Sequence, residues 1–154
     1  MGIEKTFKKF ELDVSGLNTA ESHERFLDFL KRKDYFDERY LFRGSDENEL
    51  RIIQGFSSRR KRNFYSDFDL VDETGEEEIP DYGIFCYTLN ELREISKEGG
   101  THSPVKLALD LDIPLIFVLK TEEFDKGDDY HDNLYLYKNP HKKLQALEAV
   151  VYLK

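Results

Sequence analysis

An arginine followed by a glycine, Arg43-Gly44, ends a short apolar stretch of this sequence. The five N–H donors of a guanidinium form a planar fork that suits a phosphate or a ribose. A glycine lets a ligand approach the backbone closely. The alternative is structural, because the chain has 32 acidic residues that could pair with Arg43. Taken alone, the pattern favours this structural pairing.

Two further polar residues stand at the ends of apolar stretches. Thr88 follows the aromatic-rich run 82–87, and its hydroxyl either faces a ligand or caps the next helix. Glu148 begins the apolar C-terminal run 149–153, where it is either a catalytic carboxylate or a boundary charge. Ligand pockets gather at strand ends, so we expect Arg43 and Thr88 to lie in one concave site.

A dense basic run stands out in this acidic chain, formed by Arg59, Arg60, Lys61 and Arg62. The segment 72–81 that follows is acidic, so the two runs could attract each other as solvated halves of one loop. The basic run could instead contact a phosphate or an acidic partner. Loops beside a rigid site commonly select the partner, and we expect this run to recognise an acceptor.

Length and composition limit the classes of protein. A chain of 154 residues with a net charge of −9 is predicted to form one domain that bare nucleic acid and anionic membranes repel. A single cysteine, Cys86, excludes an internal disulfide and a cysteine-based zinc site. The four histidines show no metal-like spacing. No signal core or membrane-spanning run is visible, so the expectation is a cytoplasmic protein without a metal.

The stretch 82–120 is predicted to organise the fold. Two apolar runs, 82–88 and 113–120, flank a helical pattern at Leu89–Lys97 that Gly99-Gly100 ends. This order predicts strand, helix and strand. The run Ile113–Leu119 is almost wholly apolar, which is typical of a strand covered on both faces. We expect it at the centre of a sheet.

The rest of the chain supplies further elements. A loop is expected over 57–81, interrupted at most by a strand at 64–71, and another over 122–132. Five or six strands, with helices concentrated in the first two thirds, predict an α+β fold with a mixed sheet. The remaining expected elements are helices at 21–35, 46–53 and 104–109, strands at 39–44, 133–138 and 148–154, and a strand or ordered arm within 5–14.

The order of these features resembles the ADP-ribosyltransferase superfamily, in the branch whose signature is Arg, Ser/Thr, Glu. The features are a strand that ends in Arg-Gly, a strand that ends in Phe-Cys-Tyr-Thr, a buried strand, and a last strand opened by Glu. The resemblance covers residues 39–154, with 1–18 as an N-terminal arm or strand. It implies an ADP-ribosyltransferase-like mixed sheet that uses NAD as its substrate.

The resemblance also implies the residues that would bind NAD. Arg43, followed by Gly44, would hold the nicotinamide-side ribose and phosphate. Phe85, Tyr87 and Thr88 stand where the family shows an aromatic residue followed by Ser-Thr-Ser, and they would shape the nicotinamide pocket. Tyr87 replaces the first serine, which suggests stacking on the nicotinamide ring.

The last strand carries the catalytic glutamate of the family, which Glu148 matches. Its carboxylate would stabilise the oxocarbenium-like transition state in which the nicotinamide bond breaks. Arginine-modifying members place a Gln or Glu two residues earlier, whereas this chain has Ala146 there and Gln145 one position further back. Gln145 is therefore assigned to acceptor recognition, and arginine as the target is not supported.

The resemblance thus implies a mono-ADP-ribosyltransferase that modifies a macromolecule, a protein rather than a nucleic acid, and releases nicotinamide. Two alternatives remain. One is a non-catalytic interaction or inhibitor protein with an acidic surface, on this fold or on another, and the other is an NAD glycohydrolase on the same fold. A 2′-phosphotransferase acting on RNA would need a more basic chain than a net charge of −9 provides.

Overall fold

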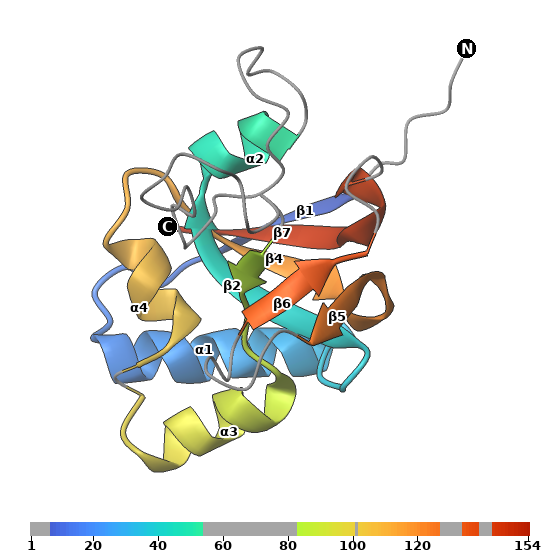
Figure 1. The fold of residues 1–154 in the computed structure, drawn as a ribbon. Coiled ribbons are helices and arrows are strands. Elements are labelled where there is room, and N and C mark those ends of the chain that lie inside the picture. The colour runs from blue at the N-terminus through green and yellow to red at the C-terminus, as the bar shows by residue number, and fades with distance from the viewer. Residues whose placement is uncertain (1–6, 54–82, 101, 127–133, 139–142) are drawn as a thin grey trace, which may run out of the picture.

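The computed structural model describes residues 7–53, 83–100, 102–126, 134–138 and 143–154. These residues form an α+β fold, as the sequence predicts (Figure 1). The helices are α1 (Thr19–Arg32), α2 (Glu47–Ile53), α3 (Leu89–Lys97) and α4 (Pro104–Leu109). The strands are β1 (Lys8–Leu12), β2 (Tyr40–Asp46), β3 (Gly83–Phe85), β4 (Pro114–Lys120), β5 (Phe124–Lys126), β6 (Leu134–Tyr137) and β7 (Leu147–Leu153), with 3₁₀ segments η1 (Thr121–Glu123) and η2 (Lys143–Ala146).

Two sheets organise these elements. The larger sheet has the strand order β1-β7-β4-β2, and the smaller has the order β3-β6-β5. The larger sheet is mixed, because β1 runs parallel to β7 while β4 is antiparallel to both of its neighbours. In Figure 1 the smaller sheet lies in front of the larger one. Helices α1, α3 and α4 pack against the opposite face of the larger sheet.

Strand β4 is central, which confirms the prediction made from its apolar run. It pairs with β2 on one side and β7 on the other. Ile116 and Val118 are fully buried in a core shared with the helices, and Leu115 and Phe117 are fully buried in a second core under the small sheet. The strand begins one residue later than predicted, and Ile113 is 46% exposed.

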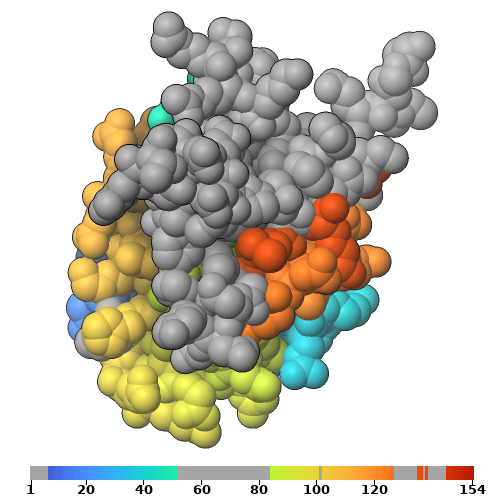
Figure 2. All heavy atoms as spheres, viewed as in Figure 1, coloured from blue at the N-terminus to red at the C-terminus, as the bar shows by residue number. Residues whose placement is uncertain are grey.

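The helix-side core is built by one face of α1, one of α3 and one of α4. Phe26 and Leu30 of α1, Leu92 of α3 and Val105 of α4 are fully buried there. Helices as short as these owe most of their stability to such an apolar face. In the space-filling view, α3 and α4 form the lower left of the visible surface (Figure 2).

Helices α3 and α4 begin where the sequence predicts, whereas α1 begins two residues before the predicted residue 21 and α2 one residue after the predicted residue 46. Asn18 and Thr88 each form a capping box, for α1 and α3, and Ser103 caps α4 with Pro104 at its first turn. Each cap oxygen satisfies a backbone N–H that has no partner within the helix. Helix α1 ends at Arg32 and not at the predicted residue 35, since Asp34 takes a positive φ of 67°.

One prediction about local structure was wrong. The predicted loop 122–132 contains strand β5, which pairs with β6 and buries Phe124. The acidic residues of this segment indicated a loop, because the strand has only one inward-facing apolar residue. The sequence did not indicate that the runs 82–88 and 113–120 contribute strands to different sheets: β3 belongs to the small sheet and β4 to the large one, and Tyr87 forms an isolated bridge to Phe42 of β2. The strand predicted at 64–71 lies outside the described residues.

None of the helices in the described part of the chain has the length and apolar composition that a membrane span requires.

Candidate functional site

Arg43 lies in the middle of β2 and points away from solvent, with a side chain that is 5% exposed. Its Nε and Nη2 donate to the two carboxylate oxygens of Glu49 at 3.0 and 2.9 Å. Its Nη1 donates to the backbone oxygen of Phe85 at 3.1 Å. The carboxylate partner that the sequence left open is therefore Glu49, six residues along the chain.

Glu49 gathers several donors around this ion pair. The Ser45 hydroxyl donates to Oε1 of Glu49, and the backbone N–H of Glu49 donates to Asp46 at the start of α2. The Glu49 side chain has no exposed surface. A buried charge is costly unless it is paired and hydrogen bonded, and this one is both. The network fixes the first turn of α2 to strand β2.

Gly44 faces the N-terminus of α4. A Cβ atom added at Gly44 would lie 2.0 Å from the backbone oxygen of Pro104. Real Cβ atoms do not approach a carbonyl oxygen so closely, so the glycine is needed for α4 to pack on β2. The close approach at this glycine is made by the protein's own helix.

The segment after β3 lies beside Arg43. Backbone N–H and C=O groups of Phe42 and Tyr87 form two hydrogen bonds of 2.8 Å. The Thr88 hydroxyl accepts from the N–H of Glu91 at 3.2 Å and caps α3. The structure thus brings Arg43 and Phe85 into contact, while the Tyr87 ring packs against the helix-side core and the Thr88 hydroxyl has the capping role that the sequence offered as its alternative. Their part in NAD binding stays a prediction.

Glu148 is the second residue of β7 and lies near Tyr40, where β2 begins. The register between β4 and β7 shifts at this point, opposite Val118 and Leu119. The Tyr35 hydroxyl donates to Oε2 of Glu148 at 3.2 Å, and Oε1 accepts no hydrogen bond from the described residues. Bulges of this kind re-aim a side chain at the end of a sheet.

A cavity of about 430 Å³ opens beside Glu148. This volume is typical of a site for a small ligand. Two cations, two carboxylates, an aromatic ring and a hydroxyl line it, and they come from the ends of β2, β4 and β7. The lining residues are Arg39, Tyr40, Lys120, Thr121, Glu122 and Glu148.

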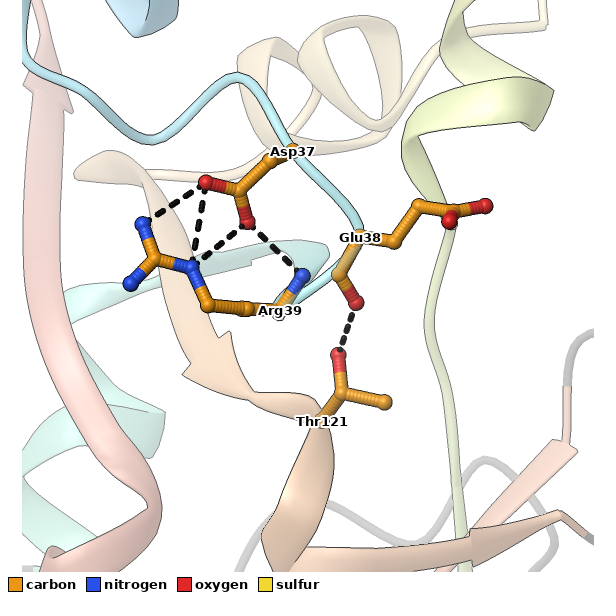
Figure 3. Close-up of polar contacts among 4 residues, drawn as sticks. All are labelled: Asp37, Glu38, Arg39 and Thr121. Atoms are coloured by element: carbon orange, nitrogen blue, oxygen red, sulfur yellow. Dashed lines mark hydrogen bonds and ion pairs between the residues drawn. The ribbon is translucent and has the colours of Figure 1, made fainter.

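Arg39 lines this cavity, and the segment 37–39 to which it belongs is held in place by polar contacts (Figure 3). Asp37 accepts from Nη2 of Arg39 at 2.8 Å and from Nε of Arg39 at 3.1 and 3.2 Å. The Thr121 hydroxyl donates to the backbone oxygen of Glu38 at 3.0 Å, and the Thr121 N–H donates to the backbone oxygen of Arg39 at 2.8 Å. The backbone at Arg39 is therefore fixed, while the Arg39 side chain is 71% exposed.

Burial and charge keep the two tyrosines beside Glu148 neutral. Burial, followed by the negative charge of Glu148, raises the pKa of Tyr35 and of Tyr40 above the usual value of 10.0. The rings of Tyr35 and Tyr40 pack edge to face, with centroids 5.2 Å apart. Hydrogen bonds to Asp37, followed by the charge of that carboxylate, raise the pKa of Arg39. At neutral pH Tyr35 and Tyr40 thus keep their hydroxyl protons, and Arg39 stays positively charged.

The sheet separates Arg43 from Glu148. Arg43 lies on the face of the large sheet that the small sheet covers. Leu41, two residues earlier in β2, points to the same face, and Arg43 donates to Phe85 there. Glu148 is bonded to Tyr35, which belongs to the helix-side core. The described residues therefore form two polar centres, one around each of these residues.

The residues assigned to acceptor recognition fall in two places. Gln145 is exposed in η2, and Ala146 is fully buried. The basic run 59–62 lies outside the residues that the structure describes. Among those it does describe, no cluster of three or more His, Cys, Asp or Glu side chains has the arrangement of a metal site.

Sequence reasoning missed four residues around Glu148: Tyr35, Arg39, Tyr40 and Lys120. A usable signal was present, because Arg39 and Lys120 stand at the start and end of two predicted strands. If those strands are antiparallel neighbours, both residues lie at one end of the sheet. Tyr35 gave no such signal, since its position depends on how the chain leaves α1.

The chain matches no family model, no curated protein and no solved structure. A functional hypothesis must therefore rest on the chemistry of these two polar centres.

Proposed function

We propose that this protein is an NAD-dependent mono-ADP-ribosyltransferase in which Glu148 is the catalytic carboxylate. The observation that carries the proposal is the cavity beside Glu148, with one carboxylate oxygen held by Tyr35 and two cations on the wall. In the reaction, the bond between ribose C1′ and the nicotinamide nitrogen breaks, and nicotinamide leaves with the electron pair. The acceptor nucleophile forms a bond to C1′ and releases its proton.

The environment of Glu148 suits this chemistry. A fixed carboxylate stabilises the positive charge that develops on the ribose ring as the bond breaks. Tyr35 fixes Oε2 of the carboxylate, so Oε1 is the oxygen assigned to the ribose hydroxyls. Arg39 and Lys120 are the cations assigned to the diphosphate, and the Tyr40 ring is the surface assigned to the nicotinamide.

Two arginines are candidates for the diphosphate. The resemblance assigns Arg43, with Gly44, Phe85, Tyr87 and Thr88 around it. The geometry favours Arg39, because Arg39 lines the same cavity as Glu148, whereas Arg43 is buried against Glu49. The acceptor in this proposal is a protein, recognised by Gln145 and by the basic run 59–62.

Nicotinamide release at saturating NAD tests the proposal. Glu148→Gln keeps the size of the side chain and removes its charge, so turnover should fall by roughly two orders of magnitude, as for loss of one preorganised electrostatic group. Arg39→Ala should raise KM for NAD with less effect on turnover. Glu94→Gln, an exposed carboxylate on α3, is the matched control and should behave as wild type.

The outcomes separate the candidate functions. A folded Glu148→Gln variant that is as fast as wild type would exclude Glu148 as the catalytic residue. Nicotinamide release that needs no acceptor, with free ADP-ribose as the product, would indicate an NAD glycohydrolase.

A non-catalytic interaction protein is the second candidate. The observation that favours it is the engagement of Arg43, the arginine assigned to NAD, by Glu49 and Phe85 within the fold. The net charge of −9 also suits a protein that occupies a basic partner. A wild-type protein that neither binds NAD nor releases nicotinamide would support this function over the enzymatic one.

A further inference from the structure

All the exposed large hydrophobic side chains in the described part of the chain lie between Leu107 and Ile113. Leu107 is 51% exposed, Leu109 38%, Leu111 41% and Ile113 46%. We call these four residues the aliphatic surface; it includes part of α4 and the connection to β4, at the left of the view in Figure 2. Scattered single apolar residues are normal on a protein surface, whereas a concentration of them marks an interaction site.

Other groups attach this part of the chain to the fold. Helix α4 packs on the core through Pro104, Val105 and Ala108, which are all buried. The connection to β4 is fixed through the backbone, because the N–H of Glu47 donates to the oxygen of Ile113 at 3.0 Å. Polar residues at these exposed positions would leave both of these contacts intact.

The charges around the aliphatic surface are mainly negative. Asp110 and Asp112 are exposed between its members. The nearby cation Lys106 lies 3.4 Å from Asp110, and this ion pair cancels one charge of each sign. Asp112 remains, within a chain whose net charge is −9. An occupant that complements this surface therefore brings apolar side chains together with positive charge.

We propose that the aliphatic surface binds a segment of a partner protein that carries aliphatic side chains flanked by lysine or arginine. The aliphatic side chains of the partner cover Leu107, Leu109, Leu111 and Ile113, and its cations face Asp112, the carboxylate that Lys106 does not neutralise. This interaction is separate from the cavity beside Glu148 and does not depend on NAD chemistry.

A labelled amphipathic peptide of leucine and lysine is the probe, and the same peptide with glutamate in place of lysine is its negative counterpart. Fluorescence anisotropy measures binding of each peptide to the full chain. The double variant Leu107→Ser with Leu111→Ser should bind the lysine peptide about tenfold more weakly, as expected for loss of central apolar contacts. The double variant Glu24→Gln with Asp28→Asn is the control for charge. It removes two negative charges from the exposed face of α1, outside the aliphatic surface, and should bind as wild type.

A charge-reversal variant, Asp110→Lys with Asp112→Lys, provides a second test that leaves every apolar side chain in place. It should lose the lysine peptide and gain affinity for the glutamate peptide. Equal weakening by the α1 control, or equal binding of both peptides to wild type, would overturn the proposal. Sedimentation of the full chain covers the remaining case: a dimer that the Leu107/Leu111 variant abolishes would assign the surface to a second copy and overturn the basic partner.

Discussion

The carboxylate of Glu148 has one oxygen engaged by a buried hydroxyl and one directed to no described partner. An arrangement of this kind orients a carboxylate without neutralising it. Tyr35 supplies the hydroxyl, and its own ring is held between Phe10 and Tyr40 by edge-to-face packing. Tyr35 is thus a positioning residue for Glu148 in the proposed reaction.

Replacing Tyr35 with phenylalanine tests this role. Tyr35→Phe keeps the ring and removes the hydrogen bond to Glu148, so we expect turnover of NAD to fall roughly tenfold with little change in KM, since misplaced catalytic groups mainly slow the chemical step. Loss of the hydrogen bond should also cost about 1 kcal/mol of stability. Nicotinamide release and thermal melts of both proteins provide the measurement.

The chain contains a matched control for Tyr35→Phe. Tyr152, near the opposite end of β7, donates to the carboxylate of Glu47 at 3.1 Å, and burial followed by that hydrogen bond raises the pKa of Tyr152 to about 12. Tyr152→Phe should therefore lower stability by a similar amount and leave turnover unchanged. Equal loss of turnover in both variants would mean that Tyr35 acts only through the stability of the fold.

At the scale of elements, helices were predictable because their signals are local. Asn18, Thr88 and Ser103 each cap a helix from within a few residues, and the sequence shows the cap and the helix together. Strand β5 was not predictable, because its position is set by pairing with β6 and only Phe124 turns inward. Gly44 was read as a place for a ligand, and only the tertiary packing identifies Pro104 as its neighbour.

The contact between β2 and α4 leads to a prediction about Gly44. Gly44→Ala places a Cβ 2.0 Å from the Pro104 oxygen, which forces α4 away from the sheet. Overpacking of a rigid backbone contact should cost about 3 kcal/mol or more. Gly16→Ala is the control, because nothing lies within 4 Å of the added atom and its cost comes from a φ of 76° alone. Denaturant melts that rank Gly16→Ala as the more damaging change would contradict this packing.

At the scale of the whole molecule, the arrangement of the two polar centres follows from topology. Arg43 and Glu148 both belong to the four-strand sheet, yet the alternation of β2 directs Arg43 to the face away from Tyr35. A sequence shows that a residue ends an apolar run, and it does not show which face of a sheet that residue will occupy. The candidate residues were therefore predictable one by one, while their grouping was not.

The helical layer depends on one buried histidine. His23 of α1 lies 2.7 Å from the Ser103 hydroxyl through Nδ1 and 3.0 Å from the Leu92 backbone oxygen through Nε2. The Leu92 oxygen only accepts, so Nε2 carries the proton and Nδ1 accepts from Ser103, whose oxygen in turn accepts from the N–H of Val105 at 3.0 Å. One neutral imidazole thus joins α1, α3 and the start of α4.

Protonation of His23 should destabilise the fold. Burial lowers the pKa of His23 below its usual value of 6.5, more than the hydrogen bond to Leu92 and the charge of Glu24 raise it. The unfolded chain therefore takes up a proton before the folded one does, so the stabilising contribution of neutral His23 is complete above pH 6.5 and is lost as the pH falls below that value. A proton on Nδ1 would also remove the acceptor that the Ser103 hydroxyl uses.

We expect the melting temperature of wild type to fall between pH 7.5 and pH 5.5. His23→Gln should melt at a lower temperature and show a flatter dependence on pH. The altered buried hydrogen bonds should make this variant about 1 to 3 kcal/mol less stable. His102, which is exposed, gives the control: His102→Gln should keep the wild-type slope, and a wild-type slope in His23→Gln would show that other groups set the acid sensitivity of the fold.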